Sequence, residues 1–119
     1  MRNKTKTKFS FSPEFQLEIL RYIIKDKEGG LILKRIKPNY LVLIEHSIIC
    51  EGIIKYYKKQ NKIPSENVLK EVIKELLEGK QYADLVTKDD IPNIDKVISN
   101  LYHLPLSDAD YIKEKIYQF

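Results

Sequence analysis

The sequence predicts a single all-α domain built from about six helices. Apolar residues recur at spacings of three and four along most of the chain, which is the period of a helix with one buried face. All glycines and prolines except Gly52 fall at the edges of these periodic segments, where they end or begin helices. The chain has 119 residues, of which 43% are apolar. One domain over residues 9–119 can therefore bury a core, but an ATPase motor domain does not fit.

The first helix is expected over 13–26. A Ser-Pro-Glu sequence at 12–14 supplies an N-cap, a proline suited to the first turn and an acid that favours the helix dipole. Gly29 and Gly30 are expected to end this helix, because glycine is common just after a helix C-terminus. A brief apolar helix is expected over 31–36.

The third helix is expected over 38–60, with apolar residues on most of its sides. A helix of this kind is central to its domain, and burial must stabilise it because Gly52 and several β-branched residues lower its propensity. Pro64 ends the segment, and Ser65 is expected to cap a fourth helix over 66–78. Six apolar residues of that helix are expected to be buried: Val68, Leu69, Val72, Ile73, Leu76 and Leu77.

Two more helices are expected near the C-terminus. Pro92 opens a fifth helix that Pro105 ends, and Ser107 with Asp110 resembles a capping box at the start of a sixth. The helical pattern then continues to Phe119 without a C-cap. We therefore expect a fragment of a longer protein, or a domain whose last helix continues into a partner.

The net charge of +4 belongs to the N-terminus. Residues 1–8 form an expected flexible basic tail with four positive side chains, so residues 9–119 carry 17 basic and 17 acidic residues; the four are Arg2, Lys4, Lys6 and Lys8. The neutral body favours protein contacts over nucleic-acid binding. Four charges on a flexible arm support only weak, salt-sensitive binding to nucleic acid.

The sequence has no feature of a secreted or membrane protein. Cys50 is the only cysteine, so no internal disulfide is expected and a cytoplasmic location is the default. The N-terminus lacks the apolar run of a signal peptide, and no run approaches the length of a membrane helix. We expect a soluble cytoplasmic protein with no membrane contact.

No motif supports catalysis or cofactor binding. A GxxxxGK[ST] phosphate loop is missing, and His46, Cys50 and His103 are too few ligands for a zinc site. His46 and Cys50 lie one helical turn apart and could form a base and thiolate pair, but core packing is the stronger interpretation. The acid pairs at 89–90 and 108–110 lie at helix starts, where capping accounts for them. The chain is expected to be no enzyme and to need no cofactor or metal.

Lysines and tyrosines mix over 55–62, a pattern that proteins binding single strands use. Lys55, Lys58 and Lys59 are therefore candidate nucleic-acid contacts, together with the basic tail. At helical spacing, the two tyrosines can instead join the core while the lysines are solvated. This second interpretation is the favoured one.

Five segments that together span 15–119 have the order and form of a known family. They are FQLEILRYII (15–24), IKPNY (36–40), EHSIICEGI (45–53), KIPSENVLKEVI (62–73) and YIKEKIYQF (111–119). In these segments the chain resembles the N-terminal domain of DnaB-type replicative DNA helicases, especially phage-like versions. It departs where many members have an acidic residue and a threonine before the fourth helix, since this chain has Pro64 and Ser65.

The resemblance implies an all-helical domain with a compact globular part and a C-terminal helical hairpin. In the family this domain forms a collar on a hexameric ring and contacts primase and loader proteins. The hairpin would comprise residues 90–119, pair between subunits and lead to a motor domain that is absent from this chain. The catalytic motifs lie in that motor domain, so no catalytic residue carries over.

The leading hypothesis is therefore a non-catalytic assembly and docking domain of a replicative helicase, a homo-oligomer that binds a primase or a helicase loader. Its expected oligomer interface is apolar, because a small domain leaves part of such a surface uncovered; the residues are Ile94, Ile98, Tyr102, Ile112 and Ile116. The alternative is a small helical nucleic-acid-binding protein that uses its basic tail. A third hypothesis is an enzyme that uses Cys50 and His46.

Overall fold

The computed structural model describes residues 10–118, and all of their regular structure is helical, which confirms the all-α prediction. The six α-helices are α1 (Pro13–Lys25), α2 (Gly29–Leu33), α3 (Ile44–Gln60), α4 (Glu66–Leu77), α5 (Ile91–His103) and α6 (Ala109–Gln118). Three short 3-10 helices lie between them: η1 (Pro38–Tyr40), η2 (Lys80–Tyr82) and η3 (Lys88–Asp90). The predicted tail at 1–8 lies outside the described residues.

The central position of α3 is confirmed. It packs against α1, α4, α5 and η1, so its apolar sides are covered from several directions. One hydrophobic core draws buried residues from all six α-helices, among them Ile19, Ile32, Ile49, Ile73, Ile98 and Ile116. Burial thus compensates for the low intrinsic propensity of α3.

The first helix begins as predicted, but the two glycines after it have a different role. The Ser12 hydroxyl oxygen accepts a hydrogen bond from the Phe15 N–H at 3.1 Å, which caps α1. Gly29 and Gly30 do not follow the C-terminus of α1; they begin α2. A Cβ atom on Gly29 would lie 2.0 Å from the Ile23 carbonyl oxygen. Only glycine therefore allows α2 to pack this closely on the last turn of α1.

The single helix predicted over 38–60 is wrong, because the chain is extended at 41–43 between η1 and α3. Buried Gln16 of α1 stabilises this extended segment, because its side-chain oxygen accepts a hydrogen bond from the Val42 N–H at 2.9 Å. The Ser47 hydroxyl donates to the carbonyl oxygens of Pro38 and Leu41. Tertiary hydrogen bonds thus replace the helical ones that this segment would otherwise make.

Three expectations about helix starts and faces need correction. Ser65 occupies the N-cap position of α4, but its side chain makes no capping hydrogen bond. Val68 is 38% exposed on α4 instead of buried. α6 begins at Ala109, so its N-cap position falls to Asp108, with φ 55°, and not to Ser107.

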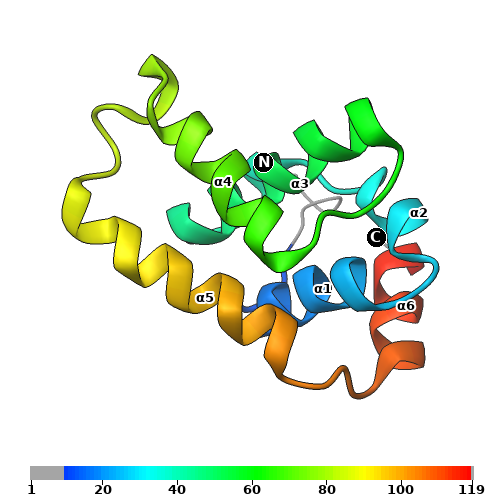
Figure 1. Ribbon diagram of the computed structural model, residues 1–119. Helices are drawn as coiled ribbons and strands as arrows, with labels where there is room; N and C mark the ends of the chain where they lie inside the picture. Colours follow the sequence, from blue (N-terminus) through cyan, green and yellow to red (C-terminus); the bar gives the residue numbers. More distant parts are fainter. Residues whose placement is uncertain (1–9, 119) are drawn as a thin grey trace.

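The last two helices do not form a separate hairpin. α5 packs against α1, α3 and α4, whereas α6 packs against α1. Figure 1 shows the two helices diverging from the loop that joins them, with α6 beside α2. Lys113 of α6 forms an ion pair with Glu28 at 2.5 Å, and the Arg35 guanidinium lies over the Tyr117 ring. Residues 90–118 are therefore part of the globular domain.

Candidate functional site

Four of the five residues predicted for the oligomer interface are buried within the single chain, so the folded domain does not expose these four to a second copy. Ile98 and Ile116 are 0% exposed, Ile94 is 1% exposed and Ile112 is 2% exposed. All four belong to the core that the six α-helices share. A second copy could contact these four residues only if the domain partly unfolded. The apolar pattern of α5 and α6 therefore reflects packing within the single chain.

Tyr102, the fifth predicted interface residue, is half-buried and joins α5 to two other parts of the fold. Its hydroxyl donates to the Pro64 carbonyl oxygen at 2.7 Å, and its carbonyl oxygen accepts from the Lys25 ammonium group at 2.7 Å. Burial raises the pKa of this phenol well above its usual value, with a smaller contribution from the Glu66 charge. Tyr102 therefore has a structural role.

Cys50 and His46 lie in the core, where their chemistry is suppressed. Cys50 is 0% exposed and His46 is 4% exposed. Burial raises the pKa of the Cys50 thiol to about 12 and lowers the pKa of the His46 imidazole, which keeps both side chains neutral at pH 7. The arrangement fits core packing, because a nucleophile needs a thiolate that substrate can reach.

The candidate nucleic-acid contacts divide into two groups. Arg2, Lys4, Lys6 and Lys8 lie outside the described residues. Lys55, Lys58 and Lys59 are exposed near the C-terminal end of α3, and their neighbours Tyr56 and Tyr57 are half-buried. The structure thus brings the lysines of α3 to the surface, as expected for either interpretation of this segment.

A polar cluster fastens α4 to α5 at one end of this helix pair. The Glu66 carboxylate pairs with Lys70 at 3.2 Å and with the His103 ring at 2.8 Å, and it accepts from the Ser99 hydroxyl at 3.0 Å. Hydrogen bonds from Lys70 and Ser99 lower the pKa of this carboxyl below its usual value. The cluster links the first turn of α4 to the last two turns of α5.

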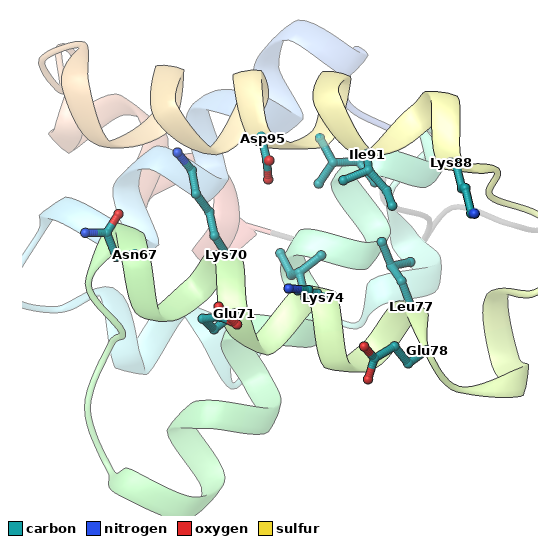
Figure 2. A pocket seen from close by; sticks show the side chains of 11 residues that line it. Asn67, Lys70, Glu71, Lys74, Leu77, Glu78, Lys88, Ile91 and Asp95 are labelled. Carbon is teal, nitrogen blue, oxygen red and sulfur yellow. The ribbon is translucent and has the colours of Figure 1, made fainter.

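Beyond this cluster, α4 and α5 enclose a groove of about 640 Å³. Figure 2 shows the antiparallel helices with Ile91 of α5 and Leu77 of α4 pointing into the space between them. Ile73 and Ile94 form its buried floor, and Ile91 is 40% exposed. The groove therefore presents apolar surface to solvent along its length.

Charged side chains of both signs border this groove. Lys70, Lys74 and Lys88 lie in its lining together with Glu71, Glu78 and Asp95. In Figure 2, Lys70 reaches from α4 toward α5, and Asp95 projects from α5 toward α4. In general, a groove with an apolar floor and charged rims binds the apolar face of an amphipathic helix. It offers no buried polar group that would orient a small polar substrate.

The sequence did not reveal this groove. The amphipathic patterns of 66–78 and 92–104 predict which residues face inward, but not how widely two helices are spaced. Ile91, one residue before Pro92, had been assigned to no helix, although it is the most exposed apolar residue of the groove. Its position beside a helix-opening proline was the available signal.

Other kinds of site have less support. Among residues 10–118, no three histidine, cysteine or acidic side chains come together as metal ligands. None of the helices in this part of the chain has both the length and the apolar character to cross a membrane. No protein-family model, curated protein or solved structure matches the chain.

Proposed function

We propose that this chain is a non-catalytic protein-docking domain, and that the groove between α4 and α5 receives an amphipathic helix of its partner. The observation that carries this proposal is the apolar lining of the groove, in which Ile91 is 40% exposed beside half-buried Leu77, between side chains of both charges. A helix with one apolar stripe and charged flanks matches such a surface in both shape and chemistry.

The resemblance to the N-terminal domain of DnaB-type helicases gives this docking its biological setting. In that setting the domain belongs to a replicative helicase, assembles with further copies into a ring, and binds a primase or a helicase loader. Self-association must then use exposed residues, because Ile94, Ile98, Ile112 and Ile116 are buried. The groove is the surface we assign to the primase or loader.

The test is a binding titration of the chain with the primase and the loader encoded in the same genome. Ile91→Glu puts a charge on the groove wall and is expected to weaken binding at least about tenfold, as for a central apolar contact. Val42→Glu is the matched control: Val42 is 68% exposed and lies away from the groove, so affinity should not change.

Circular dichroism must show that both variants remain folded. The proposal fails if neither protein binds the unmodified chain, or if Ile91→Glu and Val42→Glu bind equally well. Light scattering at rising concentration tests self-association separately from docking. A chain that stays monomeric but still binds primase would support the docking function and contradict the ring assembly.

A further inference from the structure

Residues in and around α2, η1 and the C-terminal half of α3 form a basic surface, although residues 9–119 as a whole are neutral. Residues 27–62 contain eight lysine or arginine residues and three acidic residues. All eight basic side chains are exposed: Lys27, Lys34, Arg35, Lys37, Lys55, Lys58, Lys59 and Lys62. None of them forms an ion pair with another residue of 10–118.

The three acidic residues of this segment are engaged with other parts of the fold. Glu28 forms its ion pair with Lys113 of α6. Glu45 accepts a hydrogen bond from the Asn93 side chain of α5 at 2.9 Å. Glu51 accepts from the side chains of Gln81 and Tyr82, which follow α4. Glu28 is thus paired with a lysine outside the segment, and eight basic against three acidic residues leave residues 27–62 with a net charge of +5.

Two hollows lie on this surface and share Tyr57 as a wall. The first, of about 470 Å³, is apolar inside, with Ile36, Pro38 and Ile54 in its lining. Its rim carries three lysines and no acidic residue: Lys34, Lys37 and Lys58. The apolar interior distinguishes it from a simple cluster of solvated charges.

The second hollow, of about 340 Å³, continues on the other side of Tyr57. Lys27 and Lys62 lie in its lining, and Asp26 is the only acidic residue in either lining. Gly30 allows the Tyr57 ring to sit between them, because a Cβ at that position would lie 2.5 Å from the tyrosine hydroxyl. Lysines therefore line both of the hollows that share the Tyr57 ring.

We propose that this basic surface binds single-stranded nucleic acid. The lysine rims would neutralise successive phosphates, and the apolar hollow beside Tyr57 would take a base, which is the combination that single-strand binders use. A duplex keeps its bases stacked inside and could not fill the hollow. This site is separate from the groove between α4 and α5, so its test is independent of the docking proposal.

The test measures binding of a labelled oligothymidylate to the full chain by fluorescence anisotropy. The parent variant for this test has glutamine in place of Arg2, Lys4, Lys6 and Lys8, which removes the positive charge of the N-terminal tail. Replacing Lys34, Lys37 and Lys58 by glutamine as well is expected to weaken binding at least about tenfold near 0.1 M salt. The slope of log affinity against log salt should fall in magnitude by about 2.

The matched control replaces Lys80, Lys96 and Lys115 by glutamine, three lysines that line neither the two hollows nor the groove between α4 and α5, and it changes the net charge equally. It should bind like its parent. The proposal is overturned if both triple variants lose the same affinity, or if the parent does not bind at all. Equal binding of a duplex, of an abasic strand or of polyglutamate would also overturn it, because each lacks an accessible base.

Discussion

Gln16 is a fully buried polar residue of α1, and both the nitrogen and the oxygen of its side-chain amide form hydrogen bonds. Its nitrogen donates to the Phe11 carbonyl oxygen at 2.8 Å, and its oxygen accepts from the Val42 N–H. It links the segment before α1 to the break before α3. The conformation of the chain at 41–43 thus depends on one side chain far away in the sequence.

Replacing Gln16 by leucine should destabilise the domain. The substitution keeps the volume but leaves two backbone groups without their partner, which typically costs about 1–3 kcal/mol. Thermal unfolding followed by circular dichroism measures this loss. Gln60→Leu, at an exposed position of α3, is the control and should unfold close to the unmodified temperature; equal effects of the two substitutions would contradict the role of Gln16.

Cys50 should be inert in the folded protein. Because burial raises the pKa of its thiol to about 12, the thiolate that reacts with alkylating reagents is scarce at pH 8, and the side chain is 0% exposed. Iodoacetamide labelling followed by mass spectrometry should show no modification in buffer and full modification in denaturant. Rapid labelling of the native chain would reopen the hypothesis of a reactive cysteine.

At the scale of elements, the cluster around Glu66 makes stability depend on pH. The folded pKa of this carboxyl lies below its ordinary value of 4.5, so its contribution is complete above that value and is lost as the pH falls through the lower, folded pKa. Glu66→Gln should therefore lower the unfolding temperature at pH 7, and the difference from the unmodified protein should shrink as the pH falls below 4.5 and through the folded pKa.

Glu71→Gln provides the control for this prediction. Glu71 lies on the same helix and is exposed, and it forms no ion pair within the described part of the chain. Its substitution should change the unfolding temperature little at any pH. A difference for Glu66→Gln that stays constant from neutral to acid pH would show that the carboxylate charge does not fasten α4 to α5.

The elements that sequence predicts well are those with local causes. Ser12 and Pro13 place the start of α1, and the apolar period of 66–78 places α4, because capping and periodicity act within one or two turns. The break at 41–43 has a distant cause in Gln16. The start of α2 at Gly29 depends on its approach to Ile23. Neither cause is visible in a local pattern.

The candidate site was less predictable than the fold for a related reason. Apolar periodicity marks Ile94 and Ile98 as inward-facing, but it does not say whether a helix of the same chain or a second copy covers them. The structure assigns them to the intramolecular core. The groove, by contrast, depends on how α4 and α5 pack against each other, and contacts of Glu66 with Ser99 and His103 link the two helices.

At the scale of the whole molecule, residues 9–119 are neutral in total but contain two oppositely charged regions. Residues 27–62 are strongly basic, whereas residues 63–118 contain eleven acidic and seven basic residues. The groove lies in the second region and the basic surface in the first. One small domain can therefore present different surfaces to a protein helix and to a nucleic-acid strand.

The central claim is that α4 and α5 form the docking surface, and mapping by nuclear magnetic resonance tests it most directly. The isotope-labelled chain is titrated with the primase encoded in the same genome, and amide shifts are followed residue by residue. We predict the largest changes along 70–78 and 88–95, with small changes at 34–37 and 55–62. Changes centred on the basic surface or on the outer face of α6, with the groove unaffected, would contradict the account.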